Sequence, residues 1–145
     1  MTTAELTEPK TPKTRQSAGR EIIQLPLGLL GFENVKQYVL LTNPAEEPFM
    51  WFQMMDDTRR AFLAAPPARL VPDYQPDISD DDAAFLGITD PSDAVVLNII
   101  TLRGDDRPTV NLKGPVVFNR RTRVGKQVIP NNATQYSLRH PLAAS

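Results

Sequence analysis

Proline recurs along this chain at intervals too short for long regular elements. The 145 residues include 14 prolines and 7 glycines. Proline has no backbone N–H to donate, so it interrupts helices and central strands alike. Twelve of the prolines stand between short apolar runs, at positions 26, 44, 48, 66, 67, 72, 76, 91, 108, 115, 130 and 141. This spacing predicts many short strands joined by stiff connections.

The stretch from residue 109 to residue 129, TVNLKGPVVFNRRTRVGKQVI, shows the pattern most clearly. Val110 and Leu112 alternate with polar residues, as in a half-buried strand. A Gly-Pro pair then predicts a kink, followed by a second strand, a basic turn and a return strand. The side-chain amides in this stretch can either bond the backbone of a neighbouring strand or contact a partner, and they belong to Asn111, Asn119 and Gln127.

Residues 79–87 carry helix signals instead. Ser79 can cap the first turn, three aspartates follow it, and Gly87 can end the helix. The apolar residues expected to anchor this helix are Phe85, Leu86 and Ile88. The predicted fold is mainly β, a small antiparallel β-barrel or rolled sheet of about eight short strands with one short helix. Strands are expected at 21–25, 36–42, 49–55, 61–65, 94–102, 109–113, 116–118 and 127–129, with 134–139 as a last edge strand or a docking tail.

The composition predicts one folded domain over 19–142. Hydrophobic residues make up 41% of the chain, enough for a core. Residues 1–18 are polar and rich in threonine, lysine and proline, so we expect a disordered tail there and a short tail at 143–145. No apolar run approaches the ~18 residues of a membrane span, and the start of the chain lacks a secretory signal pattern. These features favour a soluble, cytoplasmic protein.

Residue types that commonly carry catalysis are scarce. The chain has no cysteine and a single histidine, His140, so neither thiol chemistry nor a cysteine–histidine metal site is expected. No serine lies in a G-x-S-x-G turn. The aspartates at 77, 80, 81 and 82 can attract a cation, but they lack the spacing of a calcium loop and fit a helix cap better. We therefore expect no enzyme activity, metal or cofactor.

Two apolar segments allow either a structural or a binding role. The loop 26–33, PLGLLGFE, carries leucines between glycines, and it either plugs the end of a barrel or contacts a partner. The segment 49–55, FMWFQMM, either packs in the core or forms a ligand box. In both cases the structural role is the commoner one.

Charge is unevenly placed although the net charge is only −1. Residues 73–93 hold seven aspartates and no basic residue, whereas 103–126 hold seven basic residues and two aspartates. This predicts either a dipolar surface that steers a charged protein partner or two solvated loops of opposite sign. The basic cluster raises the alternative of a small RNA-binding barrel, although Phe118 is its only aromatic residue for base stacking. A flavin-binding split-barrel enzyme, using Trp51 and the basic turn, is a further alternative.

Several motifs together resemble the flagellar assembly factor FliW family. They are GLLGFE at 28–33, PFMWFQ at 48–53, PDY at 72–74, and NLKGPVVFN at 111–119 followed by QVI at 127–129. The last pair is the most specific, and the similarity covers residues 21–142. The chain departs from the family at Leu30, where the loop usually has proline, and its basic tail 1–18 lies outside the family pattern.

The resemblance implies a cytoplasmic, non-enzymatic regulator with two protein partners. One is the translational repressor CsrA, an RNA-binding homodimer that the family antagonises allosterically. The other is flagellin, which sequesters the regulator until flagellin is secreted, so that filament assembly is coupled to flagellin synthesis. We expect the free protein to be a monomer.

The partner-binding residues predicted on this basis fall into two groups. The acidic helix cap, with Asp80, Asp81 and Asp82, is expected to steer the encounter with the repressor. An exposed edge of the sheet is expected to supply the contacts. Its residues are Asn111, Lys113, Asn119 and Gln127, with Tyr74 of the PDY link added to the set.

Overall fold

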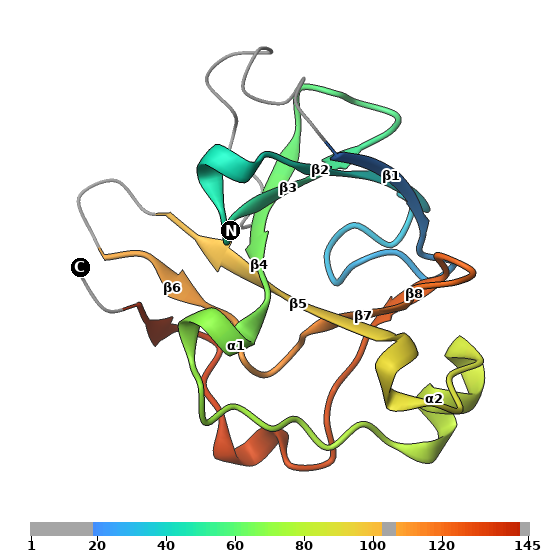
Figure 1. Cartoon of the computed structure of the whole chain (residues 1–145), viewed down its shortest axis with the longest axis vertical. Helices are drawn as coiled ribbons and strands as arrows, with labels where there is room; N and C mark the ends of the chain where they lie inside the picture. Colours follow the sequence, from blue (N-terminus) through green and yellow to red (C-terminus); the bar gives the residue numbers. More distant parts are fainter. Residues whose placement is uncertain (1–18, 103–106, 143–145) are drawn as a thin grey trace.

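The computed structural model describes residues 19–102 and 107–142, which form one strongly curved sheet with short helices outside it (Figure 1). The sheet has nine strands, and every pair of its strands is antiparallel. The predicted mainly β class is therefore confirmed. The first four strands form a meander of consecutive neighbours, β1 Gly19–Gln24, β2 Gln37–Thr42, β3 Met50–Met54 and β4 Ala61–Ala65.

The long strand β5, Ala94–Thr101, belongs to both halves of the sheet. Its second half pairs with β4 and with β6, Thr109–Val110, whereas its first half pairs with β7, Val116–Asn119. Two short strands complete the sheet, β8 Gly125–Gln127 beside β7 and β9 His140–Pro141 beside β6. The most apolar strand of the sequence is thus central, as its lack of polar alternation indicates.

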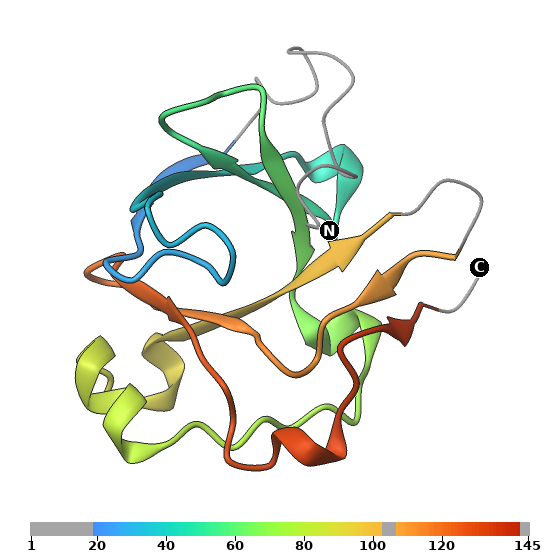
Figure 2. The same ribbon diagram turned by 180° about the vertical axis from the view of Figure 1, so that it is seen from behind.

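The sheet rolls up until β1 meets the residues just before β8 (Figures 1 and 2). The meeting point is one isolated parallel bridge, in which the N–H of Gln24 donates to the carbonyl of Arg123 at 2.8 Å. Beside it, Arg123 Nε lies 2.8 Å from Glu21 Oε1. Gly125 permits this approach, since a Cβ there would lie 2.9 Å from a methyl carbon of Leu25.

Apolar side chains fill the inside of the roll. Tyr38 and Phe52 stack there with ring centroids 4.7 Å apart. The loop 26–33 closes one end of the roll: Leu29 joins the inner core, and Phe32 meets Phe62 edge-on at 5.3 Å. Figure 1 shows this light-blue loop inside the ring of strands. The plug interpretation of the loop is confirmed, and Phe52 and Met54 of the 49–55 segment are core residues as expected.

Two smaller apolar clusters lie outside the roll. One is covered by the helix α1, Pro67–Leu70, and by the link that follows it, with Tyr74 and Ile100 at its centre. The other lies under α2, Asp80–Leu86, where Leu86 contacts Val117 and Val128. The described residues also form three single-turn 3-10 helices, η3 Pro44–Glu46, η4 Pro91–Asp93 and η5 Ala133–Gln135.

The predicted helix is confirmed with its capping residues. The Ser79 hydroxyl accepts from the N–H of Asp82 at 3.1 Å, and Gly87 ends the helix with φ of 68°. Leu86 is its buried anchor, but Phe85 remains 44% exposed. The expected anchoring role of Phe85 is therefore wrong, because a helix this short buries only a narrow stripe of its surface.

Other predicted boundaries are corrected by side-chain contacts. The strand expected over 109–113 ends at Val110, because Asn111 Oδ1 accepts from the N–H groups of Lys113 and Gly114 and turns the chain out of the ladder. The segment 134–139 forms η5 and a loop, and the edge strand lies at β9 instead. The predicted tails at 1–18 and 143–145, and part of the turn after β5, lie outside the described residues.

Candidate protein-interaction surface

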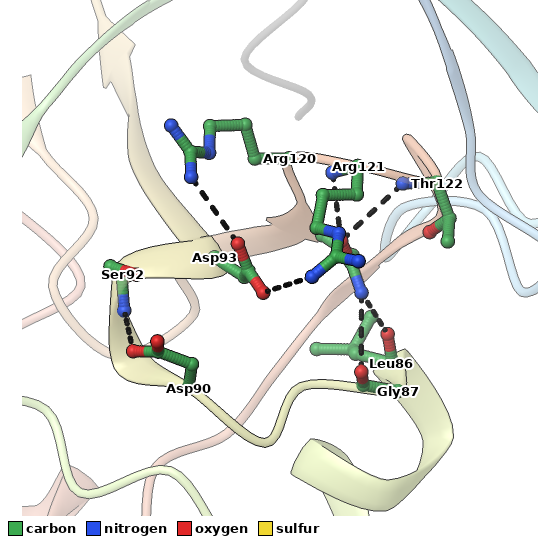
Figure 3. Close-up of polar contacts among 9 residues, drawn as sticks. Leu86, Gly87, Asp90, Ser92, Asp93, Arg120, Arg121 and Thr122 are labelled. Atoms are coloured by element: carbon green, nitrogen blue, oxygen red, sulfur yellow. Dashed lines mark hydrogen bonds and ion pairs between the residues drawn. The ribbon is translucent and has the colours of Figure 1, made fainter.

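Asn119, at the end of β7, is a buried structural hub. It is 4% exposed. Its Nδ2 donates to the carbonyls of Leu86 at 3.0 Å and Gly87 at 3.3 Å, at the end of α2. Its Oδ1 accepts from the N–H groups of Arg121 at 2.8 Å and Thr122 at 3.3 Å (Figure 3). The expectation that Asn119 lies on an exposed edge is wrong, since its amide ties α2 to the turn after β7.

The other predicted amides also bond backbone groups. Gln127 donates from Nε2 to the carbonyl of Gly114 at 2.9 Å and accepts at Oε1 from the N–H of Leu30 at 2.8 Å. It thereby holds the plug loop against β8. Asn111 forms the turn that ends β6, and Lys113 Nζ donates to the carbonyl of Ala133 at 3.0 Å. The sequence allowed these amides either to bond backbone groups or to contact a partner. In the structure they bond backbone groups.

Tyr74 is buried as well. Its hydroxyl donates to the carbonyl of Leu112 at 2.8 Å, and its ring lies edge-on to Tyr136 with centroids 4.7 Å apart. Burial raises the pKa of Tyr74 to about 12, and the Asn98 side chain beside the hydroxyl offsets part of the rise. Tyr74 thus pins the link after α1 to the sheet.

Acidic and basic segments meet in this region of the structure. Asp93 at the end of η4 lies 3.3 Å from a guanidinium nitrogen of Arg120 and 3.4 Å from one of Arg121, as Figure 3 shows. In the same 3-10 turn, Asp90 accepts from the N–H of Ser92 at 3.0 Å. That backbone hydrogen bond, with help from the Ser92 side chain, lowers the pKa of Asp90.

A second contact of this kind joins α2 to β8. Lys126 Nζ donates to Asp82 Oδ1, and the same ammonium lies 5.5 Å from the centroid of the Phe85 ring. The predicted separation into an acidic and a basic face is therefore wrong for these residues, because the two segments pair with each other. Asp80 and Asp81, by contrast, are exposed on the first turn of α2.

Exposed apolar side chains surround β8. Leu30 is 66% exposed at the tip of the plug loop, and Ile129 is 57% exposed just after β8. We define the β8 surface as these two residues together with Phe85, Lys126 and Gln127. Two contacts already described pair four of its members, since Gln127 bonds Leu30 and Lys126 approaches Phe85. Lys126 and Gln127 are adjacent in the strand and face opposite sides of it, so the two pairs flank β8. An apolar group with polar neighbours and a tied-down backbone is typical of a protein-binding site.

Sequence reasoning placed only one member of this surface, Gln127, among the contact residues. The leucines of the plug loop carried a partial signal, because a glycine-punctuated loop cannot bury all its apolar side chains. Phe85 and Ile129 gave no signal of their own. Phe85 precedes the buried Leu86 and Ile129 follows the buried Val128, and only the tertiary arrangement decides which of two adjacent apolar residues faces solvent.

Two kinds of feature are absent from the described ranges. Between residues 19 and 142, with 103–106 left out, no three acidic, histidine or cysteine residues gather closely enough to hold a metal ion. Within the same ranges, no helix combines the length and apolar character needed to cross a bilayer.

Comparison with a solved structure identifies the class of protein. The crystal structure of a flagellar assembly factor FliW shares this fold with a TM-score of 0.77, at 34% sequence identity and with 86% of each chain covered. A rolled sheet of this topology at that identity places the chain in the class of flagellar assembly factors.

Sequence comparison then gives the family. The family model described as FliW protein matches residues 7–142. A flagellar assembly factor FliW from Leptospira interrogans is 33% identical over 132 residues, covering 90% of this chain and 87% of the relative. One from Syntrophus aciditrophicus is 38% identical over 110 residues, covering 75% and 70%. The chain belongs to the FliW family. The match starts at residue 7, so part of the tail that the motifs left outside the family pattern lies inside it.

Proposed function

We propose that this chain binds the translational repressor CsrA and flagellin in the cytoplasm, and so couples flagellin synthesis to filament assembly. The observation that carries the proposal is the FliW family match over residues 7–142, together with the shared fold. In this proposal the free protein is a monomer. It contacts the repressor beside its RNA-binding site and acts on that site allosterically, and bound flagellin keeps it from doing so.

The partner contact in this proposal is the β8 surface. Leu30 and Ile129 are its apolar anchors, and large apolar side chains that become fully buried supply most of the affinity of such interfaces. The hydrogen bonds of Gln127 support the choice, because they hold the plug loop in place before a partner arrives and so reduce the entropy lost on binding.

The predicted contact residues take different parts in this proposal. Gln127 lies on the β8 surface, and the exposed Asp80 and Asp81 steer the encounter from the neighbouring α2. Asn119 and Tyr74 act from inside the protein by holding α2 and the link after α1. The remaining three predicted residues support the same loops through the contacts described above, namely Asn111, Lys113 and Asp82.

An RNA-binding function has less support. Four of the basic residues that raised it are engaged by carboxylates, and a side chain held in this way is less available to a phosphate. The four are Arg120, Arg121, Arg123 and Lys126.

Titration calorimetry with purified repressor and with purified flagellin tests the proposal. We expect both to bind the wild-type chain, and flagellin to displace the repressor. Ile129→Asp should weaken binding by about tenfold or more, because it places a charge in an apolar contact. The matched control is Leu138→Asp, since Leu138 is 59% exposed and lies outside the β8 surface.

Two outcomes would contradict the proposal. Absence of binding to both proteins at micromolar concentration would remove the function itself. Equal effects of Ile129→Asp and Leu138→Asp would leave the function in place and remove the β8 surface as its site. Bound flavin in the purified protein, visible as a yellow colour, would favour the split-barrel enzyme instead.

A further inference from the structure

We infer that a groove on the outer face of β3 and β4 binds a lysine or arginine side chain presented by a protein partner. The groove has a volume of about 450 Å³ and is lined by Ala45, Glu46, Glu47, Phe49, Trp51 and Leu63. Figures 1 and 2 show that η3, the teal turn between β2 and β3, lies on the opposite side of the molecule from α2. The groove is thus a separate site from the β8 surface, and it does not depend on the partners proposed above.

The floor of the groove is apolar and fixed. Trp51 pairs with Leu63 across β3 and β4, which places both side chains on the same face of the sheet. Leu63 and Phe49 also pack against the cluster under α1. These residues are therefore held from behind while they line the groove in front, and binding does not require them to rearrange.

The wall of the groove carries two carboxylates on an ordered turn. Asn43 Oδ1 accepts from the N–H of Ala45 at 3.0 Å, and the N–H of Phe49 donates to the carbonyl of Glu46 at 2.9 Å. These bonds fix the backbone on both sides of Glu46 and Glu47. Both residues line the groove beside its apolar floor, so their carboxylates can reach a cation bound there.

The charge of the groove selects a cation. Within residues 19–102 and 107–142, neither Glu46 nor Glu47 takes part in an ion pair, whereas Glu21, Asp82 and Asp93 all do. None of the described residues that line the groove is basic. Carboxylates and the negative faces of aromatic rings both attract cations, and the effect grows where water is partly excluded.

The apolar floor decides which cation fits. A bare metal ion prefers oxygen ligands on all sides and gains nothing from Trp51 or Leu63. Lysine and arginine combine a charged head with a methylene stem that packs on apolar surface. The stem matches the floor and the head matches the rim, so a basic side chain of a partner protein satisfies both parts of the groove.

Trp51 provides a direct probe, because it is the only tryptophan of the chain. The full chain would be titrated with a short glycine-flanked arginine peptide, and with the same peptide carrying uncharged citrulline. Tryptophan fluorescence and amide chemical shifts of residues 45–51 are recorded together. We expect the arginine peptide to shift both signals, the citrulline peptide to bind at least about fivefold more weakly, and added salt to weaken the difference.

Two double variants test whether the peptide binds to the groove or is attracted by the acidic residues of the protein in general. Glu46→Gln together with Glu47→Gln should weaken the arginine peptide by about fivefold or more. Asp80→Asn together with Asp81→Asn removes the same charge from exposed positions on α2 and should leave the peptide affinity unchanged. An arginine peptide that shifts no signal near Trp51, or that loses affinity equally in both double variants, would overturn the inference. Because the probe is a peptide, this result is independent of whether the repressor and flagellin bind.

Discussion

Two neighbouring parts of the acid-rich segment cover the sheet in different ways. The link around Tyr74 is held by burial of the tyrosine ring against Tyr136, and its hydrogen bonds run to the carbonyl of Leu112 and to the side chains of Asn132 and Tyr136. The helix α2 buries little apolar surface beyond Leu86 and is tied down by polar contacts from Asn119 and Lys126. Helices shorter than about 12 residues are only marginally stable in isolation. The polar contacts therefore stabilise α2 in place of a large buried apolar surface.

The aspartates of α2 also differ in burial and in role. Asp82 is buried and paired, so its charge serves the fold. Asp80 and Asp81 lie two residues and one residue earlier on the same turn and are exposed, so their charges remain available to a partner. The following substitutions, in order of decreasing expected effect, test whether some polar groups serve the fold and others remain free to contact a partner.

The largest effect is expected for Asn119→Asp. A carboxylate oxygen would replace the Nδ2 that donates to Leu86 and Gly87, and it would face their carbonyls. Burial without donors costs roughly 2–3 kcal/mol of unfolding free energy. Chemical denaturation measures this, with Asn34→Asp at an exposed loop position as the control. A stable variant with weakened partner binding would instead show that Asn119 is a contact residue.

Asp82→Asn should come next, with a loss of about 1–2 kcal/mol. The variant breaks the ion pair with Lys126, whose side chain is 27% exposed and can partly recover hydration. Asp80→Asn serves as the control at an exposed position of the same turn. Equal denaturation midpoints for the two variants would contradict the division proposed for α2.

Tyr74→Phe should cost about 1 kcal/mol, because the Leu112 carbonyl loses its donor. It also tests a pH effect. Burial raises the pKa of Tyr74 from 10.0 to about 12, so the folded state favours the neutral phenol. The resulting stability is present below the unfolded value and is lost as pH rises from 10 towards 12.

Thermal melts between these pH values would therefore show a shallower alkaline loss in Tyr74→Phe than in the wild type. Some loss should remain, since burial also raises the pKa of Tyr38, which the variant keeps. Identical alkaline profiles would mean that Tyr74 does not report on the attachment of the link.

Reversal of both exposed charges, Asp80→Lys with Asp81→Lys, should cost less than about 1 kcal/mol, through the helix dipole alone. Its main effect is expected on binding kinetics. The association rate with the repressor should fall several-fold at low salt, and the difference should vanish at high salt. Unchanged association kinetics would refute the steering role of these aspartates.

Local patterns predicted most strands and α2, because alternation and caps act between residues close in sequence. Ser79 and Gly87 delimit the helix in the sequence as they do in the structure. Even the error at β6 is local in origin, since Asn111 bonds the backbone two and three residues ahead and ends the strand.

The site was harder to predict because its contacts are long-range. Lys126 and Asp82 are 44 residues apart in sequence, and Leu30 and Gln127 are 97 apart. The sequence shows which segments are acidic and which are basic. It does not show which charged side chains pair, because the pairs form between loops that the rolled sheet brings together. For the same reason, Asn119 looked like a surface amide until α2 was placed against it.

The two ends of the roll meet at one isolated bridge, which pairs Gln24 with Val124. All other neighbouring strands are joined by ladders of at least two residue pairs, so this junction has the shortest backbone pairing in the roll, with the ion pair of Arg123 and Glu21 beside it. Because β1 is paired with β2 alone among the described strands, loss of this junction would leave the rest of its outer backbone as an open sheet edge.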